Sequence, residues 1–289
     1  MVWVSTWGVG AHAQAGYATD RDILYRDGVD LDDYARQMCR LDVYHPVASA
    51  SGAEADNQGA NETEAEAEGF TTVVWLHAGG LKRGGRYVPG ELRGQGLAVV
   101  AVGYRLSPNV KAPAYIEDAA AAVAWTLENI DRYGGDPDRV VVAGSSAGGY
   151  LSAMVGLDKR YLAAHGVDAN RLAGIASLSG QAITHVAVRE ERGIARDRPV
   201  IDGFAPLRHV RADAPPILIT TGDRDLELLG RYEENAFFLR MLKVAGHPDA
   251  ELFELEGFGH TAELEQTALP LLLRFVQRLQ GQADAKASE

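Results

Sequence analysis

The stretch RVVVAGSSAGGY, residues 139–150, decides how this chain is expected to fold. Its first half is a run of β-branched and small residues, which is typical of a strand buried on both faces of a sheet. Its second half, from Ala147, begins an alanine-rich segment that predicts a helix. Between the two lies Gly144-Ser145-Ser146-Ala147-Gly148, which matches the G-x-S-x-G pattern of a sharp strand-to-helix turn called a nucleophile elbow.

The chemistry of such a turn explains its residues. A side chain at the tip sits in strained backbone, and bulky neighbours would clash with the packed strand or helix, so glycine is required on both sides. The turn also puts Ser146 at a helix N-terminus, where partial positive charge favours developing negative charge. The alternative is an ordinary connection rich in small residues, and the flanking strand and helix favour the elbow.

Outward from this stretch, buried strands alternate with helices. Strands are predicted at residues 71–77, 96–104, 139–144, 172–180, 215–222 and 251–257, and helices at 113–133, from 147, at 231–246 and finally up to 280. This alternation predicts an α/β fold with a mostly parallel central sheet and helices on both faces. Residues 23–26 and 40–48 are expected to form an antiparallel pair at one edge. Residues 181–214 show no clear strand and predict a short insert or lid over the carboxyl edge, where ligands bind in such sheets.

Composition limits the classes of function. With 289 residues, 46% of them hydrophobic, residues 1–289 are expected to form one domain. No run of about 18 apolar residues is present, so no membrane span is predicted. Forty acidic residues against 28 Lys and Arg give a net charge of −12, which argues against nucleic-acid binding. Three segments are expected outside the core: an N-terminal extension (1–20), an acidic flexible loop (48–69) and a disordered tail (281–289).

The cellular compartment is not fixed by the sequence. The single cysteine, Cys39, is interpreted as a small buried hydrophobe, and a lone cysteine says little about export. The first residues, MVWVSTWGVGAHAQAGYA, contain small residues like those at a signal-peptidase site but lack a basic region before them. A trimmed leader therefore stays open, with the cytoplasm slightly favoured over a secreted or periplasmic location.

A serine nucleophile needs a base and an orienting acid, which follow it in the order Ser, Asp, His on elbow-bearing sheets. His260 ends GFGH after the last predicted strand, and Asp223 and Asp225 both lie in GDRD after the strand at 215–222. Each follows a strand, so each is expected at the same carboxyl edge as Ser146. Asp223 is alternatively a turn-capping residue. The remaining candidate histidines, which lack this placement, are interpreted as surface or loop residues: His185, His209 and His247.

An acyl-transfer site also needs donors for an oxyanion. The loop after residues 71–77 carries His77-Ala78-Gly79-Gly80, similar to the HGGG-type motif, and the amides of Gly79, Gly80 and Ala147 are the predicted donors. His77 is expected to hold the loop by side-chain hydrogen bonds. The loop lacks the G-K-[ST] ending of a phosphate-binding loop, and neither H-E-x-x-H nor a Cys/His cluster is present. No metal and no organic cofactor are therefore expected.

These motifs together resemble a known family. From residue 73 to about 279 the chain is similar to the carboxylesterase and lipase branch of the α/β-hydrolases, close to hormone-sensitive-lipase-like esterases and feruloyl-esterase or arylformamidase-like members. The matching stretches are HAGG, GYRLSP, PAYIEDAAAAVAW, GGDPDRVVVAGSSAGG, PPILITTGDRD and GFGH. The resemblance implies the α/β-hydrolase fold, and it selects Asp225, the third residue after Gly222, as the acid. Gly103 and Tyr150 depart from the family pattern.

The resemblance implies a serine carboxylesterase that cleaves small-molecule esters through an acyl-enzyme, with Ser146, Asp225 and His260 as its triad. An arylformamidase or other amide hydrolase using the same triad is the first alternative. A non-catalytic binding protein on a hydrolase scaffold is the second. Acyl and alcohol specificity and the oligomeric state are not determined by the sequence.

Overall fold

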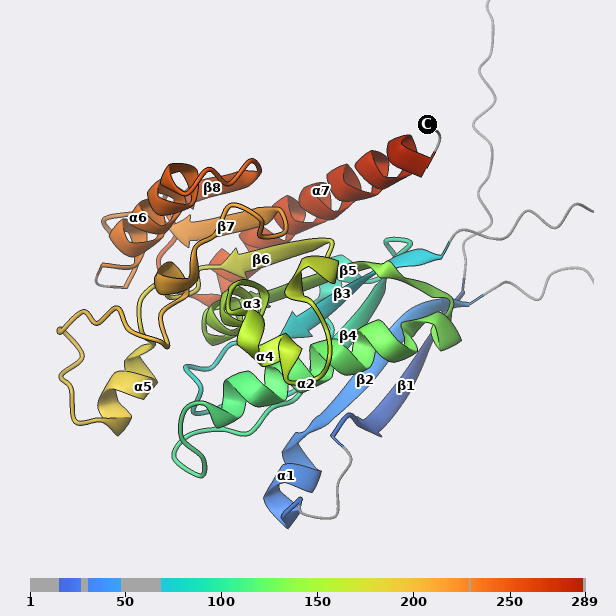
Figure 1. The fold of residues 1–289 in the computed structure, drawn as a ribbon, viewed down its shortest axis with the longest axis horizontal. Helices are drawn as coiled ribbons and strands as arrows, with labels where there is room; N and C mark the ends of the chain where they lie inside the picture. The colour runs from blue at the N-terminus through green and yellow to red at the C-terminus, as the bar shows by residue number, and fades with distance from the viewer. Residues whose placement is uncertain (1–15, 27–30, 48–68, 229, 288–289) are drawn as a thin grey trace, which may run out of the picture.

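The computed structural model describes residues 16–26, 31–47, 69–228 and 230–287. Within them, one eight-stranded sheet has the order β1-β2-β4-β3-β5-β6-β7-β8 (Figure 1). The strands are β1 (Gly16–Leu24), β2 (Arg40–Val47), β3 (Phe70–Leu76), β4 (Ala98–Val102), β5 (Gly135–Ser145), β6 (Gly174–Leu178), β7 (Ile217–Gly222) and β8 (Ala250–Leu255). β1 and β2 pair antiparallel, β2 also runs antiparallel to β4, and every pair from β4 to β8 is parallel. The predicted fold class is confirmed.

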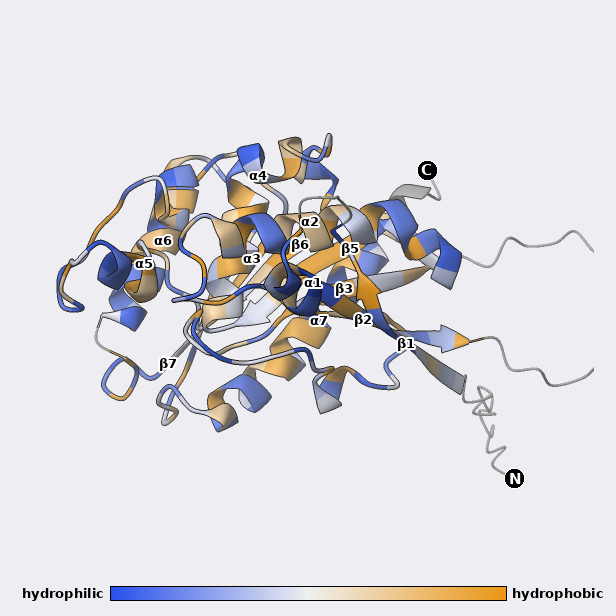
Figure 2. Ribbon diagram, turned by 90° about the horizontal axis from the view of Figure 1, so that it is seen from below, coloured by the Kyte–Doolittle hydropathy of each residue, from blue (hydrophilic) through white to orange (hydrophobic). Residues whose placement is uncertain are grey.

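Helices cover both faces of the sheet. They are α1 (Asp33–Met38), α2 (Ala114–Asn129), α3 (Ala147–Leu157), α4 (Lys159–Ala163), α5 (Val186–Glu191), α6 (Arg231–Val244) and α7 (Ala262–Ala287). Because strand side chains alternate between faces, Val74 and Leu76 of β3 join a core with α2, α3 and α6, whereas Val73 and Trp75 join a second core with α7. Figure 2 shows the apolar strands between these two helical layers.

The first strand and the last helix differ from the prediction. β1 begins at Gly16, inside the predicted N-terminal extension, although its TDRD segment carries no apolar alternation. Residues 281–287 continue α7 instead of forming a disordered tail, because alanine, glutamine and lysine extend a helix readily. Residues 1–15, and all but Gly69 of the predicted acidic loop, lie outside the described residues. Among described helices, none is long and apolar enough to cross a bilayer.

The segment at residues 181–214 is partly helical and partly irregular. It contains α5 and a short 3₁₀ turn at Pro206–His209, and in Figure 1 it lies on the side to which the parallel strands point. Its backbone folds back on itself, since the Leu207 N–H donates to the Ala182 carbonyl at 2.9 Å. The insert therefore borders the edge of the sheet at which a site is expected.

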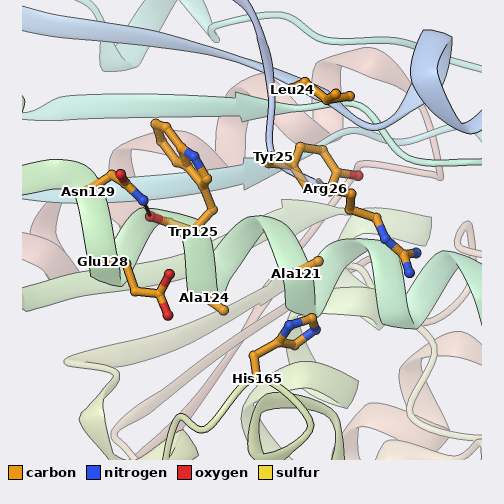
Figure 3. Close-up of a pocket in the computed structure, with 9 residues that line it drawn as sticks. All are labelled: Leu24, Tyr25, Arg26, Ala121, Ala124, Trp125, Glu128, Asn129 and His165. Carbon is orange, nitrogen blue, oxygen red and sulfur yellow. Dashed lines mark hydrogen bonds between the residues drawn. The ribbon is translucent and has the colours of Figure 1, made fainter. Parts of the chain in front are cut away.

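A cavity of about 470 Å³ lies elsewhere, between the end of β1 and α2 (Figure 3). Its polar lining is already engaged in part: Arg26 donates to the buried carboxylate of Asp118, and the Asn129 amide donates to the Trp125 carbonyl at 2.8 Å. Its other lining residues are Leu24, Tyr25, Ala121, Ala124, Glu128 and His165. Ser146 and His260 are not among its lining residues.

Candidate active site

Ser146 occupies the strained tip that the elbow pattern predicts. Its backbone has φ 54° and ψ −111°, a positive φ that side-chain-bearing residues rarely adopt. The Ser146 N–H donates to the Leu178 carbonyl at 2.7 Å, and its own carbonyl accepts the Tyr150 N–H at 3.0 Å. These bonds tie the turn to β6 on one side and to the first turn of α3 on the other, so the strain is held by the surrounding fold.

Close backbone packing explains the two glycines of the elbow. A Cβ added at Gly148 would lie 1.9 Å from the Leu76 carbonyl oxygen, and one at Gly144 would lie 2.6 Å from the same atom. α3 therefore begins directly against the end of β3. The same contact brings the start of α3 beside the loop that carries His77, whose carbonyl oxygen would be 2.9 Å from the added Gly148 Cβ.

The structure brings Ser146 and His260 together. The Ser146 Oγ lies 2.7 Å from Nε2 of His260, whose other ring nitrogen, Nδ1, lies 2.7 Å from Oε1 of Glu227. Because a carboxylate can only accept, Nδ1 carries the proton and Nε2 is left to accept from the serine hydroxyl. This tautomer is the one a general base needs, since Nε2 can then take the Ser146 proton.

The acid in contact with His260 is thus Glu227, and the prediction of Asp225 is corrected. Asp225 is exposed, and no hydrogen bond between it and His260 occurs among the described residues. The reason is a tight turn: the Asp223 carbonyl accepts the N–H groups of Leu226 and Glu227 at 3.1 and 2.8 Å. Its carboxylate accepts the N–H groups of Asp225 and Gly257. Asp223 is therefore the turn-capping residue of the alternative interpretation, and the turn directs Asp225 outward and Glu227 inward.

Glu227 is held as a carboxylate. Its side chain is 1% exposed, and this burial alone would raise its pKa. Hydrogen bonds from His260 and from the Ser179 hydroxyl, at 2.7 and 2.6 Å, outweigh burial and lower the pKa of Glu227 from 4.5 to about 2. The N–H groups of Gly222 and Leu228 also donate to it, at 3.1 and 2.8 Å. Glu227 is therefore ionised over the whole neutral and mildly acidic range.

Of the predicted oxyanion donors, Ala147 directly follows the serine, and Gly79 and Gly80 lie in the loop after β3, whose end packs against the start of α3. Gly79 and Gly80 have φ values of 127° and 66°, which suit glycine, and a Cβ at Gly79 would lie 1.9 Å from the Arg83 carbonyl oxygen. Within the described chain, the N–H groups of Gly79, Gly80 and Ala147 make no backbone hydrogen bond outside the regular elements.

Known proteins resemble the chain in sequence and in fold. The BD-FAE family matches residues 61–174. Esterase LipC of Mycobacterium tuberculosis is 30% identical over 212 residues, covering 66% of this chain and 51% of the relative. Carboxylesterase NlhH of the same species is 41% identical over 93 residues, 30% of this chain and 29% of the relative. The chain spans about half the length, or less, of the curated relatives it matches.

Solved structures agree over nearly the whole chain. Esterase B from Lactobacillus rhamnosis superposes with a TM-score of 0.67 at 20% identity, covering 94% of this chain and 89% of that one. A truncated carbohydrate esterase from gut microbiota gives 0.66 at 18% identity, covering 93% and 98%. The chain therefore has the α/β-hydrolase fold. At these identities the structural neighbours establish the fold of the chain and nothing further.

Gly103 and Tyr150, the two residues that depart from the family pattern, each have a steric or hydrogen-bonding reason. A Cβ at Gly103 would lie 2.7 Å from the Met38 carbonyl oxygen, and the Gly103 carbonyl accepts the Tyr25 hydroxyl at 2.7 Å. Tyr150 is fully buried, and its hydroxyl donates to the Phe204 carbonyl at 2.8 Å. Tyr150 thus anchors the insert to the helix that starts at the nucleophile.

His185, His209 and His247 are more buried than predicted. His185 and His247 are buried rather than surface residues, and His209 is partly buried. The ring of His185 packs on Tyr150 with centroids 5.0 Å apart, and its Nδ1 accepts the Ala187 N–H at the start of α5. Burial, followed by the nearby positive charges of Arg231 and Arg189, lowers the pKa of His185 well below its usual value. His185 is therefore a buried, neutral residue of the insert.

His77 holds the glycine loop as predicted. Its Nδ1 lies 2.7 Å from the Ala78 carbonyl oxygen, and its ring stacks on Tyr104, whose hydroxyl donates to the His77 carbonyl at 2.7 Å. Burial lowers the pKa of His77, so the ring is neutral.

Two residues of the site, Glu227 and Ser179, were not predicted from the sequence. Glu227 lies in the same loop as the two aspartates that were weighed, and its only signal was being a third carboxyl there. Ser179 follows β6 as Ser146 follows β5, Glu227 follows β7 and His260 follows β8. Polar residues at the ends of four neighbouring strands were therefore the signal that could have found it.

Proposed function

We propose that this protein is a serine carboxylesterase that hydrolyses small-molecule carboxylic esters through an acyl-enzyme, with Ser146, His260 and Glu227 as its triad. The observation that carries the proposal is the unbroken chain of two 2.7 Å hydrogen bonds from the Ser146 hydroxyl through His260 to the Glu227 carboxylate. The names of the curated relatives, esterases and carboxylic ester hydrolases, support the same reaction class.

In the first half of the cycle, Ser146 Oγ attacks the ester carbonyl while its proton passes to Nε2 of His260. The ionised Glu227 stabilises the imidazolium through Nδ1, and the amides of Gly79, Gly80 and Ala147 donate to the oxygen that becomes negative. The tetrahedral intermediate then collapses. The alcohol departs with the proton from His260, leaving the acyl group on Ser146.

The second half repeats these steps with water. His260 takes a proton from the water that attacks the acyl carbonyl, and it returns that proton to Ser146 Oγ as the acid leaves. Every proton transfer uses Nε2, so Nδ1 and Glu227 stay paired throughout. The positive φ of Ser146 keeps its hydroxyl at the tip of the turn between β5 and α3.

Ser146→Ala tests the proposal directly. We expect kcat on p-nitrophenyl acetate or butyrate to fall about 10³- to 10⁶-fold with the unfolding midpoint unchanged, because the nucleophile alone is removed. A fluorophosphonate probe should label the wild-type protein and spare the variant. Formylated aromatic amines in the same substrate panel separate an ester preference from the amide alternative. Near-normal ester hydrolysis by Ser146→Ala would refute the proposal.

A further inference from the structure

We propose that Ser179 is a fourth, positioning residue of this site, which orients the Glu227 carboxylate so that one oxygen is always presented to His260. The inference rests on the proposed function. It follows from the ends of the four neighbouring strands β5, β6, β7 and β8, which bring Ser146, Ser179, Glu227 and His260 to one edge of the sheet.

The Ser179 hydroxyl contacts both partners of the charged pair. Its Oγ lies 2.6 Å from Oε2 of Glu227 and 3.2 Å from Nδ1 of His260. Since the carboxylate can only accept, the hydroxyl donates to Oε2 and turns a lone pair toward the Nδ1–H of His260. The Nδ1–H is then shared between Oε1 of Glu227, at 2.7 Å, and Ser179 Oγ.

Glutamate makes such a restraint useful. Its side chain has one more rotatable bond than aspartate, and its carboxyl group can turn about the last bond. In this site Oε2 accepts from Ser179 and from the Gly222 N–H at 3.1 Å, while Oε1 accepts from the Leu228 N–H at 2.8 Å and from His260. A carboxylate fixed in this way does not have to reorganise when His260 becomes positively charged.

The backbone of Ser179 is held in an uncommon conformation. Its φ is 49°, in the left-handed region that glycine adopts more easily than serine. Its N–H donates to the Thr220 carbonyl at 2.9 Å, its carbonyl accepts the guanidinium of Arg231, and the next carbonyl, of Gly180, accepts the amide of Asn235 at 2.9 Å. Arg231 and Asn235 are buried residues of α6, so the turn is clamped from the helix behind it.

At position 179 the backbone conformation favours glycine, whereas the hydrogen bond to Glu227 requires a hydroxyl group. This conflict supports a role for Ser179 in the reaction. Glycine would relieve the backbone but lose the donor, whereas threonine would keep the donor but add a β-branch to a left-handed turn. A serine that served only the turn should be replaceable by glycine without loss. A serine that positions Glu227 should not.

The experiment compares Ser179→Gly with Ser179→Thr. For Ser179→Gly we expect an unfolding midpoint no lower than wild type and a kcat on p-nitrophenyl butyrate lower by about 10- to 100-fold, the range for losing a hydrogen bond to a charged group, with KM little changed. Ser179→Thr should be less stable and yet faster than Ser179→Gly. Opposite rankings of stability and activity cannot arise from a structural role alone.

A double variant tests whether Ser179 acts through Glu227. In the Glu227→Gln background, Ser179→Gly should lower kcat by no more than about twofold, because the carboxylate that it positions is absent. A full additional loss there, or a Ser179→Gly enzyme with wild-type kcat, would overturn the inference. If Ser146→Ala abolishes activity in the same assays, the proposed function survives that result. If wild-type protein cleaves no ester, or Ser146→Ala does so normally, both proposals fall.

Discussion

The turns after β5 and β7, both at the carboxyl edge of the sheet, are held in shape by different kinds of residue. The turn after β5 puts Ser146 at its tip because Gly144 and Gly148 are packed against the Leu76 carbonyl, where any Cβ would clash. The turn after β7 presents Glu227 because Asp223 caps it through its carbonyl and carboxylate oxygens. The first turn is fixed by the side chain that glycine lacks, and the second by the hydrogen bonds that the oxygens of Asp223 accept from neighbouring N–H groups.

The difference teaches which side chains a pattern can assign. Steric exclusion leaves a fixed spacing in the sequence, so the nucleophile can be identified from five residues. A capped turn accepts several residue types at each position, and the side chain that points inward depends on the turn as a whole. In GDRDLE, residues 222–227, three carboxyls compete and only Glu227 contacts His260.

The largest expected effect separates the two carboxyls of the second turn. Glu227→Gln should lower kcat by about 10³- to 10⁴-fold, because the amide cannot stabilise the imidazolium of His260 as a carboxylate does. The matched variant Asp225→Asn, which also removes one negative charge from the loop, should stay within about twofold of wild type, as expected for an exposed side chain. Steady-state kinetics with p-nitrophenyl butyrate measure both. The reverse order of effects would restore Asp225 as the acid.

A smaller effect tests steric control of the first turn. Gly148→Ala should lower the free energy of unfolding by about 3 kcal/mol, because its Cβ would be placed 1.9 Å from the Leu76 carbonyl oxygen. Gly90→Ala is the control: a Cβ there has no heavy atom within 4 Å, and its effect should stay within about 0.5 kcal/mol. Urea denaturation followed by circular dichroism provides the comparison, and equal stability of the two variants would contradict the steric account.

The smallest effect concerns pH. A carboxyl whose pKa is lower in the folded protein stabilises the fold above the unfolded-state pKa, and that stabilisation is lost as pH falls through the folded-state value. For Glu227 the window runs from 4.5 down to about 2. Wild type should therefore lose on the order of 2 kcal/mol more stability than Glu227→Gln across this window, allowing for the solvent that reaches the pair. Parallel losses in urea unfolding at pH 5, 4 and 3 would show that Glu227 is not held as proposed.

Most of the fold could be predicted because the sequences of buried parallel strands are uninterrupted runs of apolar residues. TTVVWL and AVVAV are β3 and β4 almost residue for residue. β1 was placed too late because an edge strand open to water can carry charges such as Asp20 and Asp22, which hide its alternation. The end of α7 was missed because helix-forming residues without an apolar stripe resemble a tail.

The site residues could be predicted where strand order fixes their position, and could not be predicted where the conformation of a loop fixes it. Ser146 and His260 follow strands whose order fixes their meeting at one edge, and their hydrogen bond agrees with that expectation. Burial of His185 and the contacts of Ser179 depend on how the insert and α6 pack over the edge. Such contacts join segments far apart in sequence and leave no local periodicity.

Because Cys39 is buried between α1 and β2, its thiol reports when the fold opens at this position. The thiol has no exposed surface, and burial raises its pKa to about 12, so the folded state withholds it from alkylating reagents at neutral pH. Because the chain has one cysteine, each modified molecule records an opening of the fold. The rate of thiol labelling thus compares how readily the fold around Cys39 opens in different variants, under the same conditions as the ester assay.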